Sequence, residues 1–171
     1  MGPVRNDVVV VGQLARDLVL VVDKMPGPGE SGAVQVRREM LGGRGVNQAV
    51  ALAQLGMRPT LVAVVGDDRT ATDMLDQAHQ DGISMSAVVR RRGTRTGLIM
   101  YVVDSAGQWR YLEDLPPSVL LTETDVTAAP WAAAWPPSTY QWPYGTGFAF
   151  ARAATPANSM SKPLSGLTFA K

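Results

Sequence analysis

The chain has 171 residues, enough for about one ordinary domain, and its formal net charge is +1. This near-neutral net charge lacks the excess of positive charge that attracts nucleic acid or an anionic membrane, so we expect neither as a partner. Cysteine is absent, which excludes disulfides, thiolate metal sites and cysteine nucleophiles and fits a reducing compartment. With no secretory pattern at the N-terminus and no apolar run of membrane-spanning length, we expect a soluble, cytoplasmic protein.

Two short apolar runs at residues 7–11 and 18–22 are rich in β-branched side chains, which is typical of buried strands. Asp17 directly precedes the second run. A carboxylate in that place is either a cap or turn residue or an acceptor for a ligand, and the local sequence leaves both open. Residues 25–30 contain two prolines and two glycines and predict a loop. Residues 33–40 then alternate with period two, which predicts a half-buried strand that forms an edge, a flap over a site or a dimer contact.

The segment that combines most features is GGRGVNQA, residues 42–49. Its glycines permit positive φ angles and let a ligand approach the main chain closely. The apolar residues Val46, Ala49, Val50 and Ala53 then follow the spacing of one helical face, so the loop opens a helix, which we expect to be buried on much of its circumference. Helix amides emerging from a glycine loop would offer unpaired donors to an oxygen-rich or anionic ligand.

Further along, strands alternate with helices, which predicts an α/β domain with a largely parallel sheet. The patterns predict a strand over 59–65, a helix over 70–80, a strand over 83–90 and a hairpin from 96–103 and 108–112. Thr122 followed by Asp125 predicts a helix start with a variant of the capping box. A cluster of arginines is best explained as solvated surface, with anion contact as the alternative; it comprises Arg90, Arg91, Arg92 and Arg95.

The character of the sequence changes near Val126, because no Asp or Glu follows that residue. Prolines recur there, and neither helical nor strand periodicity persists. We therefore predict that residues 1–129 form the folded portion and that residues 130–171 are an atypical Pro/Trp/Ala-rich tail, poorly ordered.

Conventional catalytic and metal motifs are scarce. His79 is the only histidine and lies inside a predicted helix, so a Ser-His-Asp triad is disfavoured. Asp67 and Asp68 could bind Mg²⁺ in principle, but a helix N-terminal turn explains them better. Gly43-Arg44-Gly45 resembles half of a dinucleotide fingerprint whose last glycine is replaced by Gln48, which leaves an NAD(P)-binding oxidoreductase as an alternative. We assign no catalytic residue, cofactor-binding residue or metal ligand.

The spacing of several motifs together resembles a known family. Residues 42–49, followed after six residues by Gly56 and after nine more by Gly66, look like the N-terminal signature of the ribokinase-like (PfkB) carbohydrate kinases. Val11-Gly12 with Asp17 five residues past the glycine resembles the first substrate loop of that family. Pro28-Gly29-Glu30 resembles the start of its lid, and Gly66-Asp67-Asp68 the turn after its next strand. The resemblance covers roughly residues 7–125.

This resemblance implies an α/β ribokinase-like sandwich with a small β lid, ATP and Mg²⁺ as cosubstrates, and phosphorylation of a hydroxyl on a sugar or sugar-like molecule. By the same resemblance, Asp17 would accept hydrogen bonds from sugar hydroxyls and Asn47 would bind a further hydroxyl. Gly42 and Gly43 would let the substrate approach the backbone. A homodimer through the lid strands would be the protein partner.

The sequence also departs from the family. Ala15 stands where many sugar-kinase members have Asn, which makes ribose itself doubtful as the substrate. The GAGD-type loop of the ATP-binding half is not found, because Gly145-Thr146-Gly147 has no acidic neighbour. We therefore expect an incomplete C-terminal half: the sugar-binding half of a kinase, truncated or frame-shifted near Ala129 and inactive alone. The alternative is a non-catalytic sugar-binding or dimerisation module.

Overall fold

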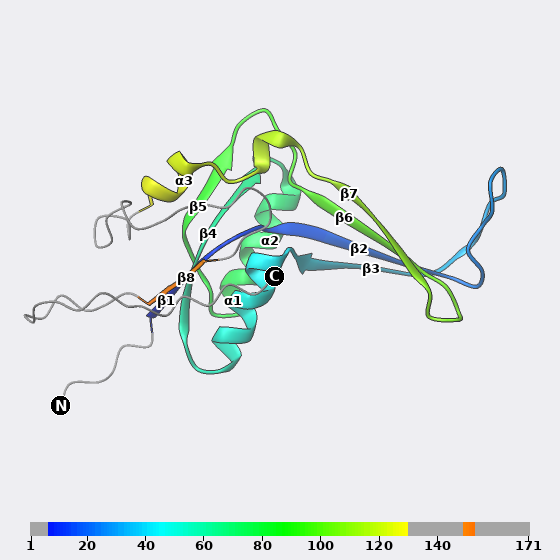
Figure 1. Ribbon diagram of the computed structural model, residues 1–171, viewed down its shortest axis with the longest axis horizontal. Coiled ribbons are helices and arrows are strands. Elements are labelled where there is room, and N and C mark those ends of the chain that lie inside the picture. The colour runs from blue at the N-terminus through cyan, green and yellow to red at the C-terminus, as the bar shows by residue number, and fades with distance from the viewer. Residues whose placement is uncertain (1–6, 130–148, 153–171) are drawn as a thin grey trace, which may run out of the picture.

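The computed structural model describes residues 7–129 and 149–152 (Figure 1). Its elements, in chain order, are β1 (Asp7–Val11), β2 (Ala15–Val22), β3 (Val34–Gly42), α1 (Arg44–Gln54), β4 (Arg58–Gly66), α2 (Arg69–Gln80), β5 (Ser84–Arg91), β6 (Leu98–Val103), β7 (Trp109–Asp114), the 3₁₀ turn η1 (Pro117–Val119), α3 (Glu123–Thr127) and β8 (Ala149–Arg152). Every strand and helix predicted between residues 7 and 129 is present, with bounds shifted by only a few residues.

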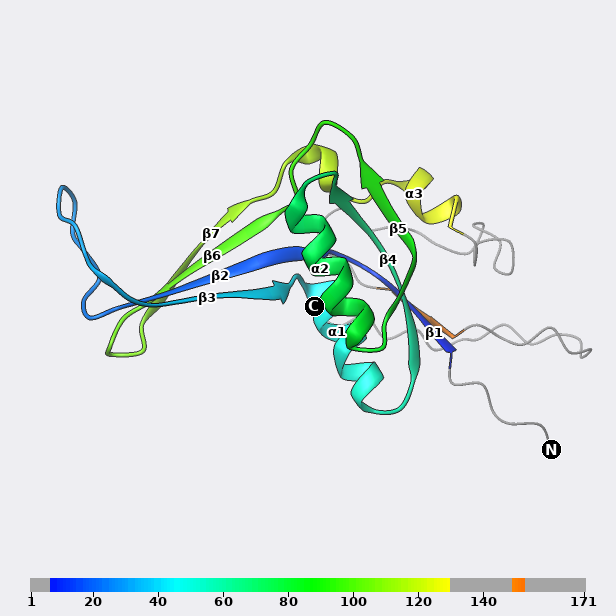
Figure 2. The ribbon, with the colours of Figure 1, turned by 180° about the vertical axis from the view of Figure 1, so that it is seen from behind.

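Within these residues the strands form two four-stranded sheets. The body sheet has the order β5-β4-β1-β8, with β1, β4 and β5 parallel and β8 antiparallel to β1. The lid sheet has the order β3-β2-β6-β7, with β2 and β6 parallel and the two outer strands antiparallel to them. Figures 1 and 2 show the lid extending from the body as a long arm, with α1 and α2 on one face of the body sheet and α3 on the other. The fold is thus the expected α/β architecture with a β lid.

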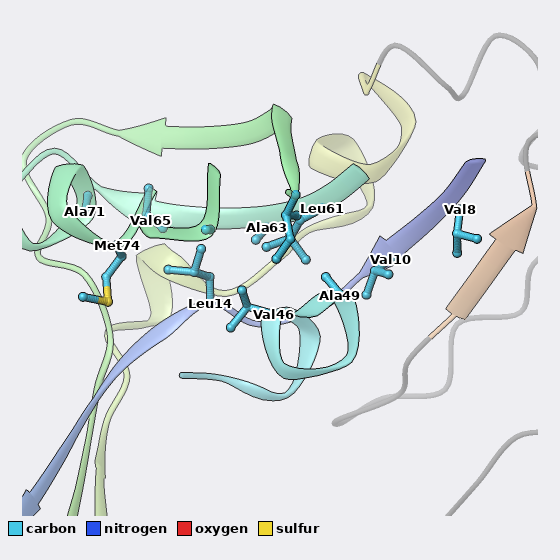
Figure 3. Close-up of a cluster of buried hydrophobic side chains, with 12 residues drawn as sticks. Val8, Val10, Leu14, Val46, Ala49, Leu61, Ala63, Val65, Ala71 and Met74 are labelled. Carbon is cyan, nitrogen blue, oxygen red and sulfur yellow. The ribbon is translucent and has the colours of Figure 1, made fainter. Parts of the chain in front are cut away.

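The body core explains why β1 and β4 are almost continuously apolar: both strands are buried on both faces. One face of the sheet, with Val10 and Leu61, packs against α1 and α2 through Val46, Ala49 and other small side chains (Figure 3). The opposite face, with Val9, Val11 and Val62, packs against Ala87 and against residues in and around α3. Because β1 and β4 are held from both sides, the loops at their carboxyl ends are anchored to the most rigid part of the fold.

Two expectations about burial are wrong. Helix α1 is buried along one face only, through Gly45, Val46 and Ala49, and Leu55 beyond its end is 79% exposed. Strand β3 is exposed on both faces from Val34 to Met40 rather than half-buried. A period-two pattern predicts which side chains share a face, but the lid arm extends beyond the helices, so no layer of the described chain covers either face of β3 there.

The ends of the short helices follow their local signals. Thr122 caps α3, and the capping box with Asp125 is complete in both directions. Within the predicted tail, the structure describes only β8, whose backbone pairs with β1; the remainder of 130–171 lies outside the described residues. None of the described helices is long and apolar enough to cross a membrane.

Candidate functional site

The candidate site lies where the β1–β2 loop meets the start of α1. Gly43 is the N-cap of α1, with φ of 97°, a backbone angle that favours glycine. A Cβ on Gly43 would lie 2.7 Å from the carbonyl oxygen of Gln13, and one on Gly45 would lie 2.6 Å from the backbone of Gly12. The glycines of the GGRG segment therefore allow two loops to pack backbone against backbone at the mouth of the site.

The first amides of α1 are already bonded. The N–H groups of Gly45 and Val46 both donate to the carbonyl oxygen of Gln13, at 3.0 and 3.2 Å. The expectation that this helix start offers those donors to an anion is wrong, because the preceding loop folds over and accepts from them. The geometry likewise gives no support to the dinucleotide alternative, which needs these amides for a pyrophosphate.

Asp17 is the most unusual side chain at the site. It lies inside β2 rather than at the end of a strand, opposite Met40 of β3. An ideal Cβ built on Gly42 would lie 2.1 Å from Asp17 Cγ and within 2.4 Å of both carboxylate oxygens. The Asp17 carboxylate therefore occupies the space above Gly42 that any other residue would fill, and Gly42 is required for Asp17 to adopt this position.

One oxygen of the Asp17 carboxylate is buried without a partner. The residue is 8% exposed, and within the described residues its Oδ1 atom is buried and accepts no hydrogen bond. Burial raises the pKa of Asp17 above its ordinary value. An unpaired buried carboxylate costs free energy, which marks it as an acceptor for a donor that the described chain does not supply.

The structure brings together three of the four residues expected to bind substrate: Asp17, Gly42 and Gly43. Asn47 lies one turn into α1, where its backbone N–H donates to the Gly43 carbonyl oxygen at 3.1 Å, and its residue is exposed. Its side chain makes no hydrogen bond within the described chain. Ala15, the departure from the family pattern, is fully buried beside Gly42 as its pairing partner.

Sequence reasoning missed the aromatic side chains of the lid. Tyr101 of β6 pairs with Val19 of β2, two residues along from Asp17, and Tyr111 of β7 pairs with Tyr101. Trp109 stacks on Tyr111 with ring centroids 5.7 Å apart. The period-two spacing of Trp109 and Tyr111 was the signal, but the closeness of these rings to Asp17 depends on the pairing of strands about 80 residues apart in sequence.

The Asp67-Asp68 turn is structural. Asp68 caps α2 by accepting from the Ala71 N–H at 2.8 Å, and it also accepts from the backbone N–H and hydroxyl of Thr96. Burial alone would raise the pKa of Asp68, but the hydrogen bonds from Thr96 and Ala71 outweigh burial and hold the pKa below its ordinary value. The helix-turn explanation is therefore confirmed, and this turn ties the body to the start of β6.

The arginine cluster at residues 90–95 makes hydrogen bonds within the protein. Arg90 donates to Thr72 and to the Asp68 carbonyl oxygen, Arg91 to Asp125 and Arg95 to Asp114. These contacts account for three of the four arginines without a bound anion.

Known proteins resemble this chain in sequence and in fold. The family model described as "pfkB family carbohydrate kinase" matches residues 5–134, about three quarters of the chain. The chain belongs to this family. A bifunctional ribokinase/ribose-5-phosphate isomerase A of Fructilactobacillus sanfranciscensis is 33% identical over 122 residues, which are 71% of this chain and 23% of that protein. A nucleoside kinase of Methanothermobacter thermautotrophicus is 28% identical over 100 residues, 58% of this chain and 32% of that protein.

Solved PfkB-family structures show the same fold. Ribokinase of Thermotoga maritima superposes with a TM-score of 0.61 at 28% identity, over 74% of this chain and 40% of that one. Ribokinase of Arabidopsis thaliana, solved with ribose and ATP, gives a TM-score of 0.56 at 24% identity over 62% of this chain and 35% of that one, which shows the fold alone. This chain thus spans about a quarter to two fifths of the length of these relatives.

The described residues form no identifiable site for the ATP and Mg²⁺ that the family resemblance implies. In the described part of the chain no three His, Asp or Glu side chains gather where they could hold a metal ion. The helix amides nearest the site are bonded to Gln13. The described site offers a buried, unpaired carboxylate oxygen beside glycine backbone, an arrangement that suits a neutral polar molecule.

Proposed function

We propose that this chain supplies the sugar-binding portion of a PfkB-family carbohydrate kinase, with Asp17, Gly42, Gly43 and Asn47 contacting the substrate. The observation that supports this most directly is the Asp17 Oδ1 atom, buried and unpaired beside the backbone of Gly42. A sugar hydroxyl is a donor of the right size and charge for it. Hydrogen bonds from hydroxyls to an ionised carboxylate are among the stronger neutral-to-charged contacts in proteins.

The proposed binding mode follows from the chemistry of each residue. Ionised Asp17 accepts from two sugar hydroxyls and thereby fixes the orientation of the ring. Gly42, without a Cβ atom, leaves room for the Asp17 carboxylate that holds the ring, and Gly43 brings its own backbone close to the same place. The Asn47 amide, exposed at the first turn of α1, both donates and accepts, so it suits a further hydroxyl.

We propose further that this chain alone does not transfer phosphate. No acidic residue follows Asp125 in the sequence, and in the described residues no three His, Asp or Glu side chains gather where they could hold a metal ion. Phosphoryl transfer depends on such groups. An assay for ADP formation with ATP, Mg²⁺ and each of D-ribose, 2-deoxy-D-ribose, D-fructose and inosine tests this directly, and turnover of any of them by the purified chain would contradict it.

Binding is tested separately by calorimetry on the 171-residue chain with D-ribose, 2-deoxy-D-ribose, D-fructose and inosine. We expect at least one of them to bind, and Asp17→Asn to weaken that binding about tenfold or more, since a hydrogen bond to a charged group contributes roughly 1.5–3 kcal/mol. If calorimetry detects no binding of any of the four compounds, the proposal is wrong.

A homodimer through the lid is proposed as the protein contact. β3 is an edge strand with exposed apolar residues Val34, Val36 and Met40. Exposed strand edges pair readily with a second copy. Light scattering after size exclusion tests this, because a monomer at all concentrations would rule it out, and Val36→Lys should convert a dimer to a monomer.

A further inference from the structure

The lid carries a row of aromatic side chains on the same face as Asp17. In the lid sheet, residues paired across strands share a face. Asp17 pairs with Ile99, and two residues further along Val19 pairs with Tyr101, which pairs with Tyr111. Two residues beyond that, Val103 pairs with Trp109. We call Tyr101, Tyr111 and Trp109 the aromatic strip.

The aromatic strip is ordered within itself but open to solvent. Tyr101 and Tyr111 have ring centroids 6.0 Å apart, and Trp109 and Tyr111 lie 5.7 Å apart in a stacked arrangement. Trp109 is 59% exposed and Tyr111 is 48% exposed. The Tyr101–Tyr111 contact crosses from β6 to β7, and the Trp109–Tyr111 contact runs along β7. Both contacts leave large aromatic faces in water.

The strip begins about one sugar ring from the carboxylate. Two residues along a strand correspond to roughly 7 Å, and Tyr101 lies on the strand adjacent to that of Asp17. Partial burial raises the pKa of Tyr101, and the Asp17 carboxylate raises it further, as expected for neighbouring groups. A ring bound at Asp17 therefore has the strip beside it, in the direction in which the lid extends.

We propose that the aromatic strip binds a planar aromatic group attached to the sugar, so that the substrate is a nucleoside rather than a free sugar. This rests on the proposed function, because the sugar part is bound by Asp17. The heteroaromatic base stacks on Tyr111 and Tyr101 while the sugar hydroxyls donate to the carboxylate. Ala15 fits this assignment: its methyl group contributes no hydrogen bond to the sugar, and affinity comes instead from stacking of the base.

The size of the effect follows from stacking energies. Base-on-aromatic stacking contributes about 1–3 kcal/mol per base, which corresponds to about 5- to 150-fold in affinity. We therefore expect inosine to bind the 171-residue chain at least about tenfold more tightly than D-ribose in calorimetry. Inosine should also quench the fluorescence of Trp109, which D-ribose should leave unchanged.

Variants on opposite faces of β7 separate stacking from lid stability. Tyr111→Leu should lower inosine affinity about tenfold and leave D-ribose affinity unchanged, whereas Tyr111→Phe, which keeps the ring, should retain the wild-type preference. Leu112→Ala is the matched control, since Leu112 is 67% exposed on the opposite face of the same strand and should change neither affinity.

The outcomes distinguish this inference from the proposed function. Equal binding of inosine and D-ribose, both lost in Asp17→Asn, would overturn the strip assignment and leave the sugar site standing. Binding of neither would overturn both. If Tyr111→Leu weakens both compounds equally, or dissociates a dimer while inosine binding is unchanged, the strip stabilises the lid or covers a second copy, and the nucleoside assignment is wrong.

Discussion

The closest contact in the candidate site makes Gly42→Ala the sharpest test of its geometry. The new Cβ would lie 2.1, 2.2 and 2.4 Å from the three terminal atoms of Asp17. Non-bonded carbon atoms prefer about 3.5–4.0 Å, so the carboxyl group must move by more than about 1 Å. An O–H···O hydrogen bond spans about 2.5–3.0 Å and does not survive that displacement.

Gly42→Ala should weaken ligand binding and lower the free energy of unfolding. Losing hydrogen bonds to a charged acceptor costs about 1.5–3 kcal/mol, or about 10- to 150-fold in the Kd for inosine or D-ribose. Overpacking at a buried site costs about 1–3 kcal/mol of unfolding free energy. Calorimetry gives the first quantity and urea unfolding followed by circular dichroism gives the second.

A double-mutant cycle isolates the contact between the two residues. In an Asp17→Ala background the atoms that the new methyl group would meet are absent, so Gly42→Ala should cost at least about 1 kcal/mol less than in the wild type. Gly32→Ala is the control, because its Cβ would meet nothing closer than 3.5 Å. If Gly42→Ala costs the same in both backgrounds, or binds sugar as the wild type does, Asp17 does not lie over Gly42.

Three further substitutions test the electrostatics and the caps. Asp17→Asn should raise the unfolding free energy at pH 7 by about 1 kcal/mol. Because the pKa of Asp17 is raised in the folded state, the stability that the protonated carboxyl contributes is full below the ordinary pKa of 3.8 and is lost as pH rises through the folded-state pKa. Urea unfolding of wild type and variant at pH 3 and pH 7 measures this, and a stability difference between the two proteins that is the same at both pH values would count against it. Asp68→Ala should lower the unfolding free energy by about 2–4 kcal/mol, because it removes three hydrogen bonds. Since the pKa of Asp68 is lowered in the folded state, the stability that this carboxylate contributes is present above pH 3.8 and is lost as pH falls through the folded-state pKa. A variant as stable as the wild type at pH 7 would contradict the hydrogen-bond network. Thr122→Ala should cost about 1 kcal/mol through the lost cap of α3, seen as faster hydrogen exchange of the α3 amides, with Thr127→Ala at the other end of the helix as a comparison.

Local signals in the sequence predicted the elements well because each depends on a few neighbouring residues. The apolar run at residues 7–11, the helix opened by GGRG and the Thr122–Asp125 capping box are all encoded within about a dozen residues. The family resemblance added Asp17 and Gly42 as a pair, and the structure supplies its physical reason, which is the carboxylate over the missing Cβ.

What the sequence could not predict depends on pairing between distant segments. The exposure of β3 follows from the lid extending past the helices, which no period reveals. The bond from Gly45 to Gln13 joins two loops about thirty residues apart. The aromatic strip faces the same way as Asp17 only through the register of β2 with β6, in which Val19 lies beside Tyr101.

Asp17 divides β2 into two arms of unequal length. Asp17 is the third residue of this eight-residue strand, so its short arm sits against the body while the other arm runs out through the lid to Val22. Five residues at about 3.3 Å each make that arm roughly 17 Å long. A rotation of the lid by about 10° about Asp17 would displace its far end by about 3 Å, so the far end of the lid is the part that a small change of angle at the carboxylate would move most.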